Sequence, residues 1–208
     1  MFFVPGGFAF GDDLGSGKVF GNKMKFKIRD HLDEFIKAKK LVVGICNGFQ
    51  ALVKMGLLPE PDFQQRVSLV GNDSGRFEDR WVILKANSAS PCIYTKGLEY
   101  IFVPVRHGEG KFIPKDDHTL NELKVNNQIV FQYVDEAKNL AGYPHNPNGS
   151  VENIAGVCDK IGRIFGMMPH PEAFNIPENC PYWVRGTIKE GYGLRIFKNA
   201  VEFMKNFD

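Results

Sequence analysis

The fold follows from one stretch, residues 41–52, which reads Leu41-Val42-Val43-Gly44-Ile45-Cys46-Asn47-Gly48-Phe49-Gln50-Ala51-Leu52. Its apolar opening predicts a buried strand and its second half a helix, so Cys46 lies where the strand turns sharply into the helix. The flanking glycines allow the steep backbone of such an elbow. The N–H groups and positive dipole end of the helix favour thiolate, the nucleophilic form of cysteine. A buried structural cysteine fits the same spacing, so a nucleophile also requires a base.

A candidate base lies far along the chain, in Gly166-Met167-Met168-Pro169-His170-Pro171-Glu172. On an extended segment side chains alternate, so His170 and Glu172 are expected to project to the same side. The prolines that flank His170 favour this extended form. By itself the segment would be a surface turn. Together with the elbow it predicts a triad in which Cys46 attacks, His170 transfers the proton and Glu172 orients the imidazole.

A third element, Val4-Pro5-Gly6-Gly7-Phe8, ends a predicted strand with two glycines. Such a loop leaves backbone N–H groups free to face a ligand. Although most Gly-Gly pairs only turn the chain, we expect this one to lie beside the elbow. The amides of Gly7 and Asn47 would then form an oxyanion hole.

With these elements in place, the chain resembles the class I, or triad, glutamine amidotransferases, and most closely the glutaminase subunits of phosphoribosylformylglycinamidine synthase. Six segments in the family order carry the resemblance and run almost from end to end: residues 5–8 with 11–14, 44–50, 72–78, 105–110, 143–150 and 167–172.

The resemblance implies an α/β, flavodoxin-like fold with an open, mainly parallel sheet flanked by helices and additional antiparallel strands, in a single domain over residues 1–208. It implies a glutaminase that passes ammonia to an ATP-dependent synthetase subunit, often with a small third subunit. The synthetase converts formylglycinamide ribonucleotide to formylglycinamidine ribonucleotide in de novo purine biosynthesis. No cofactor is expected in this chain, and ATP and Mg²⁺ are expected on the partner.

The resemblance also assigns roles to residues outside the triad. Gln50 follows the elbow and is expected to help hold the glutamine substrate, although it also reads as a polar residue on the first helical turn. Four residues of the family-specific loops are candidates for partner docking or gating, with loop structure and surface charge as the alternative: Arg76, Glu78, His107 and Glu109.

Members of the family usually have a strand-helix-strand unit before the Pro-Gly-Gly strand, whereas this chain starts at Met1-Phe2-Phe3-Val4. Such a unit occupies roughly 30 residues, and its first strand tends to lie centrally in the sheet. We therefore expect an N-terminally truncated domain with exposed apolar edges and poor solubility.

Three other function classes stay open at this point. Another class I amidotransferase would share the triad, but segments 74–78 and 146–150 favour the purine enzyme. A cysteine hydrolase or deglycase of related fold could use Cys46, but is not expected to combine His170-Pro171-Glu172 with the Pro-Gly-Gly loop. A non-catalytic binding module is the third class.

Bulk composition indicates a cytoplasmic enzyme. The 208 residues, 43% of them hydrophobic, suit one domain with a substantial core, and a formal charge of +2 gives no reason to expect nucleic acid or membrane as a partner. The cysteines at positions 46, 92, 158 and 180 lack metal-ligand spacing and are expected to be reduced thiols. Residues 11–18 are glycine-rich, but Val19 breaks the phosphate-loop pattern. With no basic and apolar signal pattern and no long apolar span among these residues, neither secretion nor membrane insertion is expected.

Periodicity predicts the secondary structure. Strands are expected over residues 81–84, 100–105, 129–133, 154–158 and 164–168, with a hairpin turn at 159–162. A helix with Ile28, Leu32, Phe35 and Ile36 on one face follows the first loop, and the helix after the elbow should end near Gly56. The closing helix carries Leu194, Phe197, Val201 and Met204 at steps of three and four.

Overall fold

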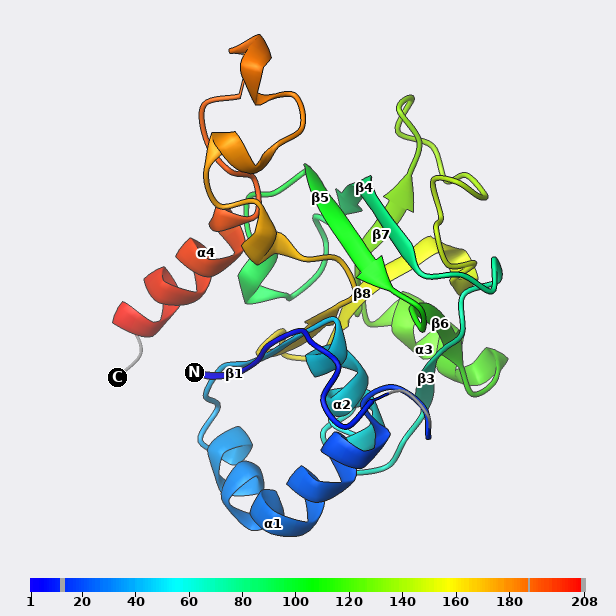
Figure 1. Ribbon diagram of the computed structural model, residues 1–208. Helices are drawn as coiled ribbons and strands as arrows, with labels where there is room; N and C mark the ends of the chain where they lie inside the picture. Colours follow the sequence, from blue (N-terminus) through cyan, green and yellow to red (C-terminus); the bar gives the residue numbers. More distant parts are fainter. Residues whose placement is uncertain (12–13, 187, 207–208) are drawn as a thin grey trace.

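The structure is a computed structural model that describes residues 1–11, 14–186 and 188–206 (Figure 1). Asp12 and Asp13, part of the segment 11–14 quoted above, lie outside the described residues. The strands are β1 (Phe2–Val4), β2 (Val42–Ile45), β3 (Val67–Val70), β4 (Glu78–Ala86), β5 (Tyr100–His107), β6 (Lys111–Pro114), β7 (Ile129–Val134), β8 (Ile154–Cys158) and β9 (Ile164–Met167). The α-helices are α1 (Lys18–Lys37), α2 (Asn47–Met55), α3 (Asp117–Val125) and α4 (Leu194–Lys205). Short 3₁₀ turns are η1 (Ile93–Thr95), η2 (Val151–Asn153), η3 (Pro171–Ala173), η4 (Pro177–Asn179) and η5 (Trp183–Arg185).

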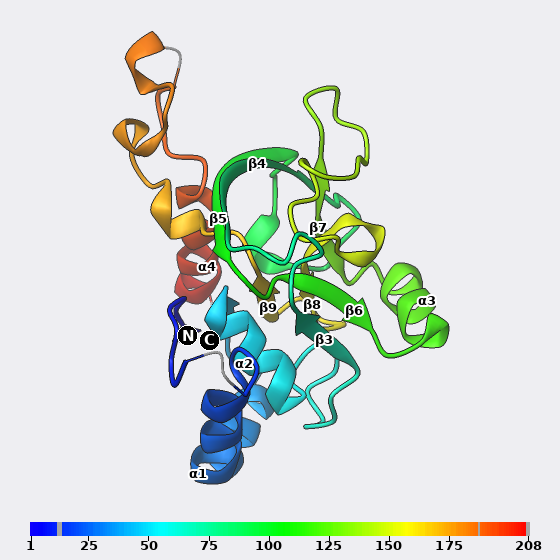
Figure 2. The same cartoon turned by 45° about the vertical axis from the view of Figure 1, so that its right-hand side comes forward.

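The main sheet is mixed and has the order β1-β2-β9-β8-β7-β4-β5. β1, β2 and β9 run parallel, and each later neighbour in this order is antiparallel. A tight turn reverses the chain between β8 and β9, and in it Gly162 N–H donates to Asp159 O at 3.0 Å. The antiparallel part of the sheet starts with this pair of strands. β3 and β6 pair separately (Figure 2). The predicted α/β class with additional antiparallel strands is confirmed. The expected mainly parallel sheet is not, because among the described residues only β1-β2 and β2-β9 pair in parallel and the other pairings of the main sheet are antiparallel.

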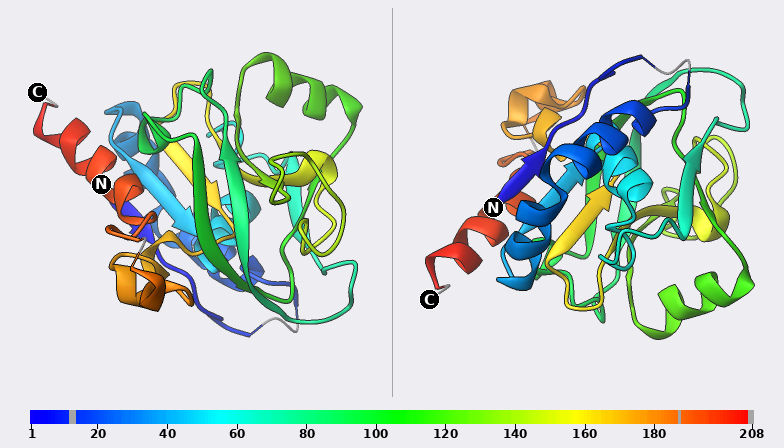
Figure 3. Two further views of the ribbon diagram at one scale, coloured as in Figure 1. Left: turned by 90° about the horizontal axis from the view of Figure 1, so that it is seen from above. Right: turned by 90° about the horizontal axis from the view of Figure 1, so that it is seen from below.

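Helices cover both faces of β1, because successive side chains of a strand point to opposite sides. The ring of Phe2 packs on Phe35 of α1 with 6.5 Å between centroids, whereas Phe3 packs on Phe197 of α4 at 6.2 Å. Seen from below, α1 and α2 lie in front of the parallel strands (Figure 3). α1 and α4 therefore pack on opposite faces of the sheet at β1, the strand that leads into the Pro-Gly-Gly loop.

α2 packs closely on β9 through Phe49. A Cβ atom on Gly166 of β9 would come within 2.1 Å of the Phe49 ring, so only glycine lets this ring lie flat on the strand. Phe49 is fully buried, and burial of such a side chain contributes about 2 kcal/mol to folding. This packing fixes the start of α2 relative to β9 and the segment that follows it.

The strands predicted at residues 81–84, 100–105, 129–133, 154–158 and 164–168 are confirmed as β4, β5, β7, β8 and β9 within a few residues at each end. The helix after the elbow ends as predicted, with Gly56 as its C-cap in the left-handed conformation at φ 76°. β3, β6 and α3 were not predicted. α3 had a readable signal, because the Asp116 side chain accepts from Thr119 N–H at 2.8 Å as an N-cap.

α1 and α4 are confirmed as helices, but α4 is rotated relative to the expected face. Its buried residues are Ile196, Asn199 and Ala200, while Val201 is half exposed. Two hydrogen bonds explain this orientation. Asn199 Nδ2 donates to the carbonyl oxygens of Tyr94 and Lys96, at 2.8 and 2.9 Å, so this side of α4 faces η1. None of the helices in the described residues has the length and hydropathy to cross a lipid bilayer.

Candidate active site

Cys46 occupies a strained elbow between β2 and α2, as predicted. Its backbone has φ 50° and ψ −108°, a region that residues other than glycine rarely adopt. The two glycines around it are required by close contacts: a Cβ on Gly44 would lie 2.7 Å from the backbone of Gly48, and one on Gly48 would lie 1.9 Å from Val4 O. The elbow therefore packs directly against the end of β1.

The structure brings the three predicted segments together at one point. A Cβ atom placed on Gly6 would lie 2.8 Å from Cε1 of His170 and 3.4 Å from Cβ of Cys46. The backbone of His170 is held by its N–H, which donates to Pro104 O of β5 at 2.8 Å. The imidazole and the cysteine thus border the same small space beside the Pro-Gly-Gly loop, although they are far apart in sequence.

Glu172 holds the imidazole of His170 as predicted, but from a different backbone conformation. Nδ1 of His170 lies 2.5 Å from Oε1 of Glu172. The predicted extended segment is wrong, because residues 171–173 form the 3₁₀ turn η3. A proline is tolerated at the first position of a helical turn, so Pro171 starts η3 instead of preventing it.

His170 favours its protonated form. Burial lowers the pKa of His170, but the nearby Cys46 sulfur and the Glu172 carboxylate outweigh burial and raise it to about 9. Its Nε2 atom is buried and makes no hydrogen bond to the described residues. The ring therefore offers an open position on the side of the sulfur.

The Cys46 thiol has a second neighbour that the sequence did not indicate. Its Sγ lies 3.6 Å from the backbone oxygen of Arg106 on β5, to which the thiol can donate. Cys46 is only 4% exposed. The sulfur thus lies between an acceptor that holds the thiol and an imidazole that can take its proton.

The predicted oxyanion donors belong to two segments that are in contact, the start of α2 and the Pro-Gly-Gly loop. Asn47 is the first residue of α2, so its backbone N–H has no acceptor within the helix. Gly7 has φ 147°, a conformation open to glycine. The Asn47 side chain joins the two segments, because its Oδ1 accepts from Ala9 N–H at 3.2 Å. The oxyanion role of these two N–H groups stays a prediction.

Gln50 is buried, and both polar atoms of its side chain make a hydrogen bond. Its Nε2 donates to Glu109 O at 2.6 Å, and its Oε1 accepts from Asn47 Nδ2 at 3.0 Å. The Glu109 carboxylate in turn accepts from the backbone N–H of Ser16 at 2.9 Å. Gln50 and Glu109 therefore tie the elbow to the loop before α1 and to the loop after β5.

His107 is the buried centre of a network that joins three of the family-specific loops. Its Nδ1–H donates to Asn72 Oδ1 at 3.1 Å, and its Nε2 accepts from Asn148 Nδ2 at 3.4 Å, a pattern that only the neutral ring satisfies. Burial, together with the nearby charge of His170, lowers the pKa of His107 to about 4. Asn72 and Asn148 were within the quoted segments, but no spacing rule distinguished them.

The four candidates for docking or gating divide by exposure. Glu78 and His107 are 3% and 1% exposed, so direct contact with a partner is excluded for them as the structure stands. Glu78 accepts from Ser74 Oγ at 2.6 Å and pairs with Arg80. Arg76 is exposed and Glu109 is half-buried. The side chain that is freely presented to a partner is therefore Arg76.

Comparison with known proteins finds a matching family, similar relatives and a similar solved structure. The model of the CobB/CobQ-like glutamine amidotransferase domain family matches residues 1–204. The chain is 49% identical over 216 residues to the phosphoribosylformylglycinamidine synthase subunit PurQ of Methanococcus maripaludis, covering 96% of this chain and 78% of that protein. It is 44% identical over 203 residues to the subunit of the same name from Dehalococcoides mccartyi, covering 97% and 78%. It is also similar to a chain in the structure of PurLQS from Thermotoga maritima, with a TM-score of 0.69, 31% identity and coverage of 97% and 78%.

Proposed function

Because the chain belongs to the family of CobB/CobQ-like glutamine amidotransferase domains, we propose that it is the glutaminase subunit of a phosphoribosylformylglycinamidine synthase. It hydrolyses glutamine to glutamate and ammonia. A synthetase partner uses the ammonia to convert formylglycinamide ribonucleotide to formylglycinamidine ribonucleotide in de novo purine biosynthesis. The observation that carries this proposal is the meeting of Cys46, at the start of α2, with a His170 ring whose Nε2 is open.

In the first half-reaction Nε2 of His170 holds the proton taken from Cys46, and the thiolate sulfur forms a bond to the side-chain amide carbon of glutamine. The carbonyl electrons move to oxygen, where the N–H groups of Gly7 and Asn47 donate to the oxyanion, and one such donor contributes about 3 kcal/mol to transition-state stabilisation. His170 then protonates the leaving nitrogen, the C–N bond breaks, and ammonia leaves a thioester on Cys46.

In the second half-reaction His170 takes a proton from water, and the oxygen attacks the thioester carbon. Glutamate leaves and the sulfur regains its proton. Glu172 keeps Nδ1–H of His170 in place throughout, because a carboxylate only accepts. The raised pKa of His170, about 9, supports a role as the group that receives the proton in each half.

Gln50 contributes to substrate binding as a positioning residue. Both functional atoms of its amide are engaged, with Asn47 and with Glu109 O, so its contribution is to fix the backbone around the glutamine site. Glu109 shares this role through Ser16 N–H.

The synthetase partner supplies what this chain does not need for glutamine hydrolysis. ATP and Mg²⁺ are assigned to the synthetase, and a small third subunit can complete the complex. Ammonia released into water at neutral pH is protonated and loses its nucleophilicity, so it must pass to the synthetase through a sheltered route. We assign gating to Glu78, His107 and Glu109, since their networks join the loops around the elbow, and docking to Arg76.

We place the protein in the cytoplasm. Cys46, Cys92, Cys158 and Cys180 are free thiols, which fits a reducing compartment and is required for Cys46 to react. Cell fractionation tests this assignment, and recovery in an oxidising compartment would contradict it.

The proposed function is tested by ammonia release from glutamine, measured for the chain alone, with the synthetase, and for Cys46→Ala with the synthetase. The complete complex is expected to release ammonia and form product, and Cys46→Ala is expected to lose both. Ammonium chloride should restore product formation with Cys46→Ala, which shows that the synthetase is intact. Glutamine-dependent product formation by the Cys46→Ala complex would overturn the proposal.

A further inference from the structure

We propose that the contacting rings of Phe8 and Phe77, which are tilted by 40° to each other, are the apolar centre of the surface that docks the synthetase partner. This inference rests on the proposed function, which requires such a partner. The two rings come from loops far apart in sequence, and their centroids are 6.0 Å apart. Phe8 is 58% exposed and Phe77 is 53% exposed, so each ring leaves about half of its surface in water even when the two are in contact.

The pair lies at the edge of the site on both of its loops. Phe8 directly follows Gly7, whose N–H is assigned to the oxyanion hole. Phe77 directly precedes Glu78, which is paired with His107 across β4 and β5. A partner seated on the two rings therefore contacts the residues next to the oxyanion loop and next to the buried network of His107.

The occupant follows from the chemistry of the product. Ammonia formed at Cys46 must reach the synthetase without protonation, so the synthetase has to cover this edge of the site and exclude water from it. Aromatic side chains suit this requirement, because they bury a large apolar area with few rotatable bonds and are enriched in the central part of protein interfaces.

The surroundings of the pair have the charged rim of an interface. Arg76 is exposed beside Phe77. The side chains of Arg106 and Asp79 are 51% and 67% exposed and lie 3.7 Å apart in an ion pair. A surface with an apolar centre and charges of both signs around it fits a folded protein partner with a complementary pocket.

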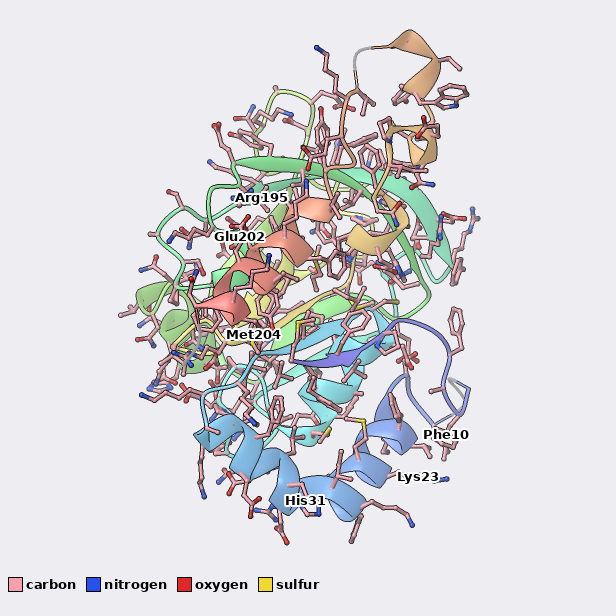
Figure 4. All side chains as sticks on the ribbon, turned by 90° about the vertical axis from the view of Figure 1, so that its left-hand side faces the viewer. Phe10, Lys23, His31, Arg195, Glu202 and Met204 are labelled. Carbon is pink, nitrogen blue, oxygen red and sulfur yellow. The ribbon has the colours of Figure 1, made fainter. Side chains whose placement is uncertain are left out.

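A further exposed ring lies on the loop before α1. Phe10 is 56% exposed, and Lys23 Nζ lies 4.2 Å from its ring centroid (Figure 4). Phe26 provides a contrast on α1: it is 91% exposed and lies one turn beyond Lys23 on the helix, away from the elbow. Phe26 is therefore a matched control, an exposed phenylalanine outside the proposed surface.

The test is the dissociation constant of the complex with the purified synthetase, measured by sedimentation for the unchanged chain and for Phe8→Ser, Phe77→Ser and Phe26→Ser. We expect Phe8→Ser and Phe77→Ser each to weaken binding by about 10-fold or more, and Phe26→Ser to change it by less than about 2-fold. Thermal unfolding of each variant shows that the fold is kept, since substitutions of exposed side chains usually have small effects on stability.

The outcomes separate this inference from the proposed function. If the unchanged chain binds the synthetase and supports glutamine-dependent synthesis, but Phe8→Ser and Phe77→Ser bind as tightly as it does, the docking surface is wrong and the function stands. Equal weakening by all three substitutions also overturns the docking surface, because it shows no preference for the edge of the site. If the unchanged chain neither binds the synthetase nor supports the reaction, the proposed function fails and the docking surface with it.

Discussion

Nδ1 of His170 lies 2.5 Å from Oε1 of Glu172. A carboxylate cannot donate, so Nδ1 keeps its hydrogen and Nε2 is the atom that exchanges protons with the Cys46 sulfur. The orientation of the ring thus depends on one acceptor, which η3 presents.

Glu172→Gln should lower kcat for glutamine hydrolysis by about 100-fold, because the amide can turn its NH₂ group to the ring and favour the wrong tautomer. The pKa of His170 should fall from about 9 towards 6.5, which NMR titration of the ring measures. Glu178→Gln, on the exposed turn η4, is the matched control and should change neither quantity. A His170 titration that is the same in both variants would contradict the assigned role of Glu172.

The raised pKa of His170 also makes the stability of the protein depend on pH. The folded pKa of His170 is above the unfolded value of 6.5. The contribution of the protonated ring to the free energy of unfolding is therefore fully present below pH 6.5 and is lost as the pH rises through about 9. Glu172→Gln should therefore lose less stability over this alkaline range than the unchanged protein.

His107 predicts the opposite behaviour in acid. Its folded pKa of about 4 is below 6.5, so the unfolded chain binds the proton more readily and stability is lost as the pH falls from 6.5 to 4. The loss from this group is about 3 kcal/mol. The free energy of unfolding, measured with urea between pH 4 and 7, should depend less steeply on pH for His107→Gln. For His118→Gln, whose side chain is 81% exposed, the pH dependence should be the same as in the unchanged protein.

Gly6→Ala should lower kcat by roughly 10- to 100-fold, because the new methyl group would lie 2.8 Å from His170 Cε1 and displace the ring from the sulfur. KM should change less, since the methyl group acts on the proton-transfer pair. Gly71→Ala is the control, because a Cβ there meets no atom within 4 Å. Steady-state kinetics on both variants decides the matter, and equal activity would show that the imidazole does not need its observed position.

Gln50→Glu should raise KM for glutamine by roughly 10-fold, because it replaces the donor to Glu109 O with a carboxylate that repels the carbonyl. Gln65→Glu removes a similar side-chain donor to a backbone oxygen, Val67 O, at an exposed position, and should leave KM unchanged. If both variants behave alike, Gln50 has no special relation to the substrate site.

Local sequence rules were sufficient to predict the elbow. Gly44 and Gly48 were expected from backbone freedom, and the structure shows that a Cβ on either would meet backbone atoms. The apolar residues that marked β4, β5, β7, β8 and β9 reflect burial of one or both faces of each strand, which a single sequence displays directly. The meeting of Cys46 with His170 was predicted from complementary chemistry and from the family resemblance.

The features of the site that the sequence did not predict depend on contacts between segments that are distant in the chain. No pattern marks Arg106 O as the acceptor near Cys46 Sγ, because every residue has a carbonyl group. Glu78 and His107 read as surface residues from their charge, but their partners Ser74 and Asn72 satisfy them in the interior. The 3₁₀ turn η3 was missed because Pro171 allows both an extended segment and the start of a turn.

The most direct test of the central claim is to quench the complete complex during turnover with isotopically labelled glutamine and to map the label by peptide mass spectrometry. The mechanism predicts one glutamyl group in thioester linkage on the peptide that contains Cys46, released by hydroxylamine and absent from Cys46→Ala. Continued glutamine hydrolysis by Cys46→Ala, or label on another residue, would contradict the assignment of Cys46 as the nucleophile.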